Sequence, residues 1–189
     1  DTTGVSDTVI IGGSTNPVSF TGPVTFNAEF VRFDQDLDAT GNTVTFNAEV
    51  TMGADAELTA QDVAFNQAVT LSDKVLTVNV SGTGTANAVT AAGGGLTKDG
   101  GGTLTITGQI DDTGTGFSGV VNGGELKVQN TTNSLGESSS TWTVNSGGIL
   151  EAVGNGSVSG LGSADVTLNS GELEFVMPPN PFTDAPGQL

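Results

Sequence analysis

Apolar and polar residues alternate along most of this chain in short runs, and one run recurs at a nearly constant spacing. It has the form Gly-x-Leu-x-apolar, and its leucines are Leu104, Leu126, Leu150 and Leu173. These leucines lie 22, 24 and 23 positions apart. Alternation of this kind is typical of a β-strand rather than a helix. Repetition at a fixed period of this length indicates one strand unit stacked on copies of itself, which is a solenoid.

The N-terminal half carries a second repeated phrase, Val-x-Phe-Asn. It occupies residues 24–27, 44–47 and 63–66, with spacings of 20 and 19. The alternation places Val and Phe on one face of each strand and Thr and Asn on the other. We therefore expect the phenylalanines to stack as an aromatic column inside the coil, with members Phe20, Phe26, Phe46 and Phe65.

In the C-terminal half, an asparagine closes the strand that precedes each leucine phrase. These residues are Asn122, Asn145 and Asn169, spaced 23 and 24 apart, in step with the leucines. Glycines follow them directly and supply a sharp turn. Asparagine at a fixed corner suits left-handed backbone geometry and can form an amide ladder from layer to layer. We predict a structural role for these asparagines and for the leucines.

The period predicts an all-β, parallel β-solenoid of roughly eight or nine rungs. We expect residues 1–177 to form a single rod, with the Phe-Asn repeats in 1–92 and the leucine-phrase repeats in 93–177. Residues 178–189 contain four prolines. Because proline lacks the amide hydrogen that a central strand needs, this stretch is interpreted as a tail or linker.

Composition narrows the choice of partners. The chain has 4 Lys and Arg against 21 Asp and Glu, a net charge of −17, and no His or Cys. Such an acidic surface repels phosphate backbones, which argues against nucleic acid as a partner. The sequence contains no apolar run of 18 residues, so we expect no membrane insertion by this segment.

Residues 94–108, Gly-Gly-Leu-Thr-Lys-Asp-Gly-Gly-Gly-Thr-Leu-Thr-Ile-Thr-Gly, closely resemble the autotransporter-associated β-strand repeat. Residues 116–119 and 121–126 continue the likeness, which covers roughly residues 93–175. The resemblance implies a right-handed parallel β-helix in the passenger region of a secreted bacterial protein. Such passengers usually serve as adhesins or stalks, and the family offers no catalytic residues to transfer.

The first candidate for chemistry is an acidic row, Asp34, Asp36 and Asp38. On a strand these carboxylates would share one face, about 7 Å apart by the strand rise. Oxygen ligands in such a row could hold Ca²⁺. The row lacks the central glycine and the final glutamate of an EF-hand loop, and a solvated outer face is the alternative interpretation.

Two further features are candidates for catalytic or ligand-binding groups. Asp111 and Asp112 suggest the paired carboxylates of β-helical polysaccharide hydrolases, although they lead into a glycine-rich loop. Trp142 precedes Val144 in a strand, which favours a core position over a sugar-stacking one. With no histidine and a single arginine, a polysaccharide-active enzyme is the least favoured function.

The sequence thus predicts a non-catalytic, extracellular bacterial surface protein, a structural or adhesive rod without a cofactor other than the candidate Ca²⁺. The alternative is a self-assembling subunit of an extracellular filament or sheath, built by head-to-tail stacking of open solenoid ends. The expected partner is a cell-surface ligand in the first case and another copy of the chain in the second. Both functions place the protein at the cell surface or outside the cell.

Overall fold

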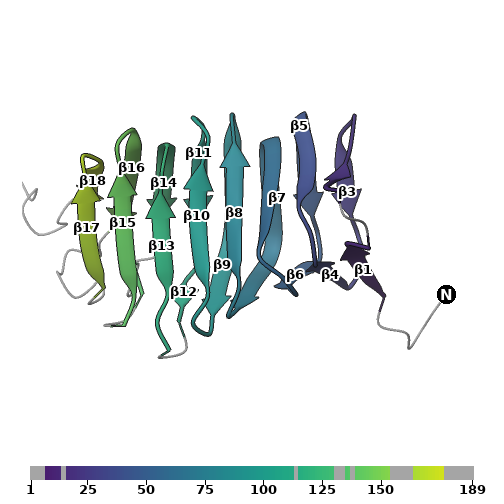
Figure 1. The fold of residues 1–189 in the computed structure, drawn as a ribbon, viewed down its shortest axis with the longest axis horizontal. Coiled ribbons are helices and arrows are strands. Elements are labelled where there is room, and N and C mark those ends of the chain that lie inside the picture. Colours follow the sequence, from purple (N-terminus) through teal and green to yellow (C-terminus); the bar gives the residue numbers. More distant parts are fainter. Residues whose placement is uncertain are drawn as a thin grey trace, which may run out of the picture.

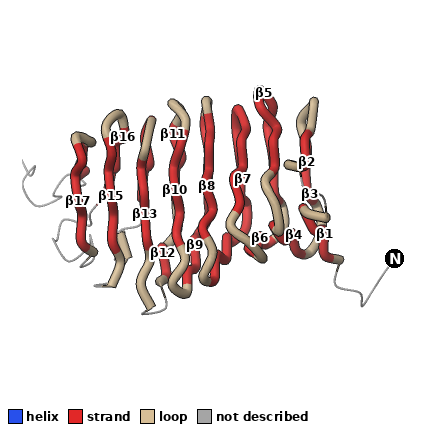
Figure 2. Tube along the Cα trace, in the orientation of Figure 1, coloured by secondary structure: helices blue, strands red, loops and turns tan. Residues whose placement is uncertain are grey.

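The computed structural model describes residues 7–13, 16–112, 115–129, 135–136, 139–153 and 164–176. Their regular elements are 18 β-strands joined in one sheet, and no helix occurs among them (Figures 1 and 2). Within these residues there is accordingly no helix that could cross a membrane. The predicted tail, residues 178–189, lies outside the described residues.

The strands stack in three columns, and each named pair is parallel. The first column contains β1 (Thr8–Ile11), β4 (Phe30–Phe33), β6 (Glu49–Met52), the ends of β7 (Ala56–Ser72) and β9 (Thr83–Ala91), and β12 (Ile110–Asp111). The second contains β2 (Val18–Ser19), the starts of β5 (Leu37–Phe46) and β7, then β8 (Val75–Val80), β10 (Gly95–Asp99), β13 (Ser118–Val121), β15 (Thr141–Asn145) and β17 (Asp165–Asn169). The third contains β3 (Val24–Phe26), the end of β5, the middle of β7, the start of β9, β11 (Thr103–Ile106), β14 (Gly124–Val128), β16 (Gly148–Val153) and β18 (Glu172–Val176).

The second and third columns each hold eight stacked strand segments, which corresponds to a solenoid of about seven turns from the first layer to the last. The predicted all-β parallel solenoid is therefore confirmed. Figure 1 shows the layers side by side in chain order, from purple at the N-terminal end to yellow at the C-terminal end. With neighbouring strands about 4.8 Å apart, the stacked layers span roughly 35 Å.

The core follows from the alternation read in the sequence. The rings of Phe26, Phe46 and Phe65 are stacked, with the centroids of successive rings 5.0 Å apart and nearly parallel ring planes, at interplanar angles of 4° and 6°. Phe20 differs from the expected column, because its ring meets Phe26 edge-on at 84° with centroids 6.1 Å apart. Phe20 directly follows β2 in the second column, so its ring meets Phe26 from that column instead of extending the stack in the third.

The leucine phrase occupies one register position in the third column. Leu104 is paired with Leu126, Leu126 with Leu150, and Leu150 with Leu173. The first three are no more than 1 % exposed. Gly124, the first residue of one copy of this phrase, has φ +62°, and a Cβ there would overlap the backbone oxygen of Gly102. Both the backbone angle and the close approach of layers therefore require glycine at this turn.

Candidate functional site

The structure does not bring the acidic row together. Asp34 lies in a bend after β4, where it accepts a hydrogen bond of 2.7 Å from the Arg32 guanidinium. Asp36 accepts one of 2.7 Å from the amide of Glu57, and only Asp38 is within a strand, β5. Because the first two residues are not on a strand, the spacing expected from strand rise does not apply to them. A calcium site at these residues remains a prediction without a cluster of ligands behind it.

The carboxylate of Asp38 is engaged locally. It accepts hydrogen bonds from the hydroxyl group of Thr40 at 2.7 Å and from the Thr40 amide at 3.0 Å. These two contacts, with the hydroxyl contributing most, lower the pKa of Asp38 below its ordinary value. Asp38 therefore fixes the local backbone of β5 at Thr40, which fits the alternative interpretation of a solvated outer face.

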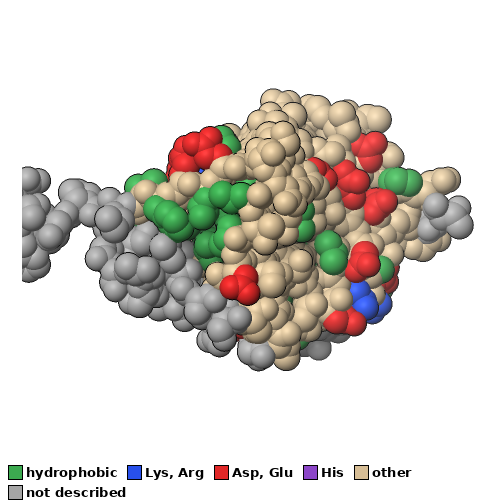
Figure 3. All heavy atoms as spheres, turned by 60° about the vertical axis from the view of Figure 1, so that its left-hand side comes forward, with side chains coloured by type: hydrophobic (Ala, Val, Ile, Leu, Met, Phe, Trp, Pro, Cys, Tyr) green, Lys and Arg blue, Asp and Glu red, His purple; other side chains and the backbone are tan. Residues whose placement is uncertain are grey.

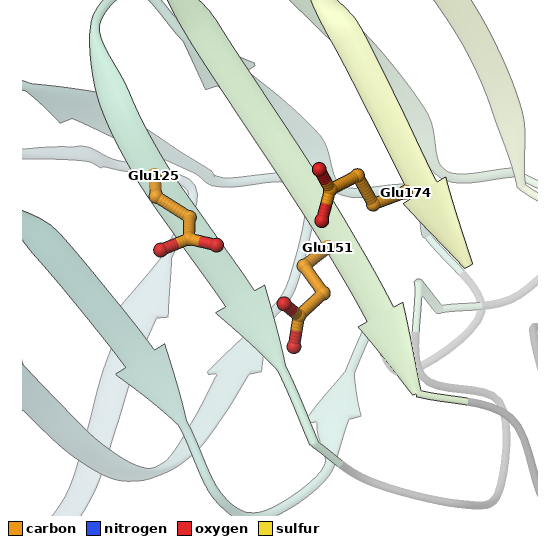
Figure 4. Close-up of side chains that lie close together, drawn as sticks. All are labelled: Glu125, Glu151 and Glu174. Atoms are coloured by element: carbon orange, nitrogen blue, oxygen red, sulfur yellow. The ribbon is translucent and has the colours of Figure 1, made fainter. Parts of the chain in front are cut away.

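A different group of carboxylates does converge, on the outer face of the third column. Glu125, Glu151 and Glu174 project from β14, β16 and β18, with one oxygen of each within 4.8 Å of the others (Figure 4). No other group of three metal-ligating side chains lies so close within the described part of the chain. The strand register explains why these carboxylates converge, since Lys127 is paired with Glu151 and Glu151 with Glu174.

Lys127 forms ion pairs with two of these three carboxylates, Glu125 and Glu151. Its ammonium group lies 2.9 Å from an oxygen of Glu125 and 2.9 Å from one of Glu151. The hydrogen bond to Glu151, followed by the one to Glu125, raises the pKa of Lys127 to about 12. Glu174, one layer further on, has no cation opposite it in the described structure.

The asparagines of the second column form an amide ladder. Asn145 donates a hydrogen bond from Nδ2 to Oδ1 of Asn122 at 2.7 Å, and Asn169 donates one to Asn145 at 3.1 Å. A second ladder links Asn27, Asn47 and Asn66 at the end of the Phe-Asn phrase, with both bonds at 2.7 Å. In both ladders each bond runs from the amide nitrogen of one layer to the amide oxygen of the layer on its N-terminal side.

Lys98 is fully buried inside the coil, at an inward position of β10. Its ammonium group donates to the backbone oxygens of Asp99, Gly100 and Gly123, at 2.7, 3.0 and 3.2 Å. Burial lowers the pKa of Lys98 to about 8, although the charge of Asp99 acts in the opposite direction. This cation ties the turns of two successive layers together.

The residues considered for catalysis are placed apart or enclosed. Asp111 is exposed at the end of β12, whereas Asp112 is fully buried and accepts a hydrogen bond of 2.5 Å from Ser140. Two carboxylates that face opposite ways cannot act as an acid and base pair on one bond. Trp142 is 1 % exposed and donates from Nε1 to the oxygen of Leu135 at 2.8 Å, so its ring is part of the core and cannot stack on a sugar.

Sequence reasoning missed three of these features, and in each case a signal was present. The N-terminal ladder follows from the repeated Phe-Asn pairs, which place an amide at the same corner every 19 or 20 residues. Lys98 shares the inward parity of Leu96, and Lys127, Glu151 and Glu174 each follow a leucine of the repeated phrase. What the pattern alone does not give is how far each side chain reaches across a layer.

The sequence is similar to part of one large adhesin. It is 34 % identical over 136 residues to the adhesin BmaC autotransporter of Brucella suis biovar 1 (strain 1330). The alignment covers 70 % of this chain and 4 % of that protein, so the chain spans a small fraction of its relative's length. No protein-family profile matches the chain, and no solved structure matches it. The similarity and the parallel solenoid together fit a passenger-type β-helix.

Proposed function

We propose that this chain is a non-catalytic stretch of the rod of a secreted bacterial surface adhesin. The observation that carries the proposal is the uninterrupted stack of parallel layers, in a chain similar over 136 residues to an autotransporter adhesin. A stack of about seven turns, filled inside by apolar side chains, is a stiff spacer. Its acidic outer surface keeps such a rod soluble and extended away from the anionic surface of a cell.

The test uses the bacterium that carries the gene. Antibodies against the purified chain should label intact cells by flow cytometry, and protease added outside should remove that label. An in-frame deletion of residues 93–176 in the gene, which removes whole layers, should reduce attachment to epithelial monolayers. Labelling that appears only after the cells are permeabilised would contradict the proposal.

End-to-end assembly into filaments is the second proposal for this chain. The exposed apolar side chains of the last described layer favour it, whereas a charge of −17 on every copy opposes it through mutual repulsion. Sedimentation velocity of the purified chain at rising concentration distinguishes the two. Growth into long species at physiological salt supports a filament subunit, and a constant monomer supports the adhesin rod.

A further inference from the structure

One corner in the middle of the rod is shorter than the same corner in the layers on either side of it. Where the third column leads into the first, the layer of β7 has three residues, 66–68, between its paired positions. The layer of β11 and β12 also has three, 107–109, whereas β9 has two, 87–88. The register between β7 and β9 shifts at this point. Irregularities of this kind re-aim side chains and often lie beside functional sites.

The short corner coincides with the end of the N-terminal amide ladder. In that ladder Asn47 donates to Asn27 and Asn66 donates to Asn47, so each amide oxygen is directed at the following layer. Asn87 holds the corresponding position of β9, directly after the residue paired with Phe65. Its side chain makes no hydrogen bond within the described structure, so the Oδ1 atom of Asn66 lacks the donor that would continue the ladder there.

A hollow lies where the ladder stops, with a volume of about 290 Å³. Its lining residues are Phe65, Asn66, Thr85, Ala86, Asn87 and Thr107. Phe65 and Ala86 are 2 % and 4 % exposed, whereas the four polar residues are exposed. The accessible walls are therefore amide and hydroxyl groups. A hollow of this volume is at the lower end of the range for small-molecule sites.

The polar groups of the hollow define the hydrogen bonds that a ligand must make. The Oδ1 atom of Asn66 requires a donor, and the amide of Asn87 can turn its Nδ2 donor toward the same space because nothing in the described structure holds it. A planar amide satisfies both, since it donates through N–H and accepts through its carbonyl oxygen. The hydroxyl group of Thr107 donates to the backbone oxygen of Ala86 at 3.3 Å, which leaves its oxygen as an acceptor for a ligand hydroxyl.

Charge and strand pairing narrow the class of ligand further. None of the six lining residues is charged, and the net charge of −17 repels anionic ligands. Figure 3 shows that neutral polar side chains and backbone cover much of one side of the molecule, with the acidic side chains in separate groups. An extended peptide is a poor occupant, because β7 and β9 each have parallel strands on both sides and offer no open edge.

We propose that this hollow binds the acetamido group of a neutral N-acetylated amino sugar. The acetamido N–H donates to Oδ1 of Asn66, its carbonyl oxygen accepts from Nδ2 of Asn87, and the ring hydroxyls face Thr85 and Thr107. The ligand amide thus takes the place of the missing step of the ladder. The proposal does not rest on the role proposed for the rod, because a stiff spacer can exist with or without such a site.

The test is a titration of the full chain followed by nitrogen–proton correlation NMR of the side-chain amides. The probe is the methyl glycoside of N-acetylglucosamine, and methyl glucoside, with a hydroxyl in place of the acetamido group, is its control. We expect saturable shifts of the Asn66 and Asn87 signals with the probe and about tenfold weaker binding of the control. Absence of saturable shifts, or equal affinity for both sugars, overturns the proposal.

Acetamide alone distinguishes an amino-sugar site from a general amide site. It carries the group that completes the ladder but lacks the ring hydroxyls, so it should bind at least tenfold more weakly than the N-acetylated glycoside. Equal binding of the two would show that the ring contributes nothing and would overturn the assignment to an amino sugar.

Two variants connect binding to the short corner. Insertion of one glutamine after Asn87 gives this corner the order Asn-Gln-Ala of residues 66–68, which should restore the ladder, close the hollow and abolish binding in a folded chain. Asn87→Ala keeps the short corner and should weaken binding at least tenfold without changing the unfolding temperature, because its side chain is exposed and makes no hydrogen bond in the described structure.

Asn27→Ala is the matched control. It removes the first amide of the same ladder, two layers away from Asn66, and should leave sugar binding unchanged. Binding that survives Asn87→Ala or the insertion overturns the proposal. An equal loss of binding in Asn27→Ala and Asn87→Ala overturns it as well, because the effect would then come from the ladder as a whole rather than from the hollow.

Discussion

At the scale of single residues, Lys98 makes stability depend on pH in a direction opposite to the usual one for a paired lysine. Its folded pKa, about 8, lies below the ordinary value of 10.5 because the buried ammonium group has lost its water. Between these values the unfolded chain binds more protons than the folded chain, so the free energy of unfolding rises with pH. This gain in the free energy of unfolding begins near pH 8 and is complete above about pH 10.5, where Lys98 is neutral in both the folded and the unfolded chain.

We predict that the free energy of unfolding increases by about 2 kcal/mol between pH 8 and pH 10, and that Lys98→Met abolishes the increase. Urea titrations across this range measure it. Lys98 can be observed in this pH range because the chain has no Tyr, Cys or His, and because the pKa of Lys127 is raised to about 12. A wild-type stability that is flat or falling between pH 8 and pH 10 would contradict the assignment.

Gly119 shows the packing constraint on a single position. It is paired with Trp142 in the next layer, and a Cβ at Gly119 would overlap the indole ring. The ring has no free space to enter because it is 1 % exposed and rests against Phe117, with centroids 5.3 Å apart. Gly119→Ala should therefore destabilise the chain by about 2–3 kcal/mol, measured by urea unfolding.

The matched control is Gly101→Ala, at an exposed bend where a Cβ would meet nothing within 4 Å. This change should be neutral or slightly stabilising, since alanine restricts the unfolded chain more than glycine does. Equal effects of the two substitutions would show that the Trp142 ring is not fixed against β13.

At the scale of elements, the direction of the amide ladder distinguishes its members. Asn145 uses its amide nitrogen on Asn122, whereas Asn122 uses only its oxygen within the ladder. Asn145→Asp removes the donor and sets two acceptors against each other, so we expect a loss of about 1 kcal/mol. Asn122→Asp adds the same charge but keeps its acceptor, so its effect should be smaller. Urea unfolding of both variants measures the difference, and equal losses would mean that charge alone matters.

Lys127 holds strands β14 and β16 together through their outer face. Lys127→Met leaves Glu125, Glu151 and Glu174 close together with no cation, so the free energy of unfolding should fall by roughly 1 kcal/mol at low salt. Added salt screens the repulsion and should recover part of this loss. Lys74→Met is the control, because among the described residues Lys74 pairs only with its sequence neighbour Asp73. Similar losses in both variants at low salt would contradict a specific role for Lys127.

The lysine at position 127 also has a defined pH dependence. Its folded pKa, about 12, lies above the ordinary value of 10.5, so the stability that it contributes is present below about pH 10.5 and lost as pH rises through 12. Lys98 and Lys127 therefore act in separate pH ranges and with opposite signs. Measurements below pH 10.5 report on Lys98 without interference from Lys127.

The elements were predictable from sequence to the extent that strand periodicity governs them. Register followed from the repeated leucines because a shift of one residue would turn Leu126 or Leu150 toward solvent. The acidic row was not predictable in the same way. Asp34 and Asp36 lie in the turn between β4 and β5, where the chain no longer follows strand geometry, and the sequence gives no measure of that turn. The cluster at Glu125, Glu151 and Glu174 requires the register of three layers at once.

At the scale of the whole molecule, each layer contacts only its neighbours, so stability is distributed along the rod rather than shared equally. The middle layers contain β7 and β9, whose inward residues are almost all buried. The last described layer has a neighbour on one side alone within the described structure, and its inward residues Leu168 and Phe175 remain half exposed. Local opening should therefore begin at β17 and β18 and proceed toward the middle.

Hydrogen exchange measured by mass spectrometry tests this order. We expect protection to be highest in β7 and β8 and to decrease toward β18, with opening free energies near the global value in the middle and close to zero at the end. Leu58→Ala, at a fully buried position of β7, should cost about 3 kcal/mol and lower protection throughout the rod. Leu173→Ala, in the last described layer, should accelerate exchange in β16 and β18 and leave β7 unchanged. If both variants changed exchange equally in every strand, the rod would unfold as one cooperative unit and the layers could not be treated as separable neighbours.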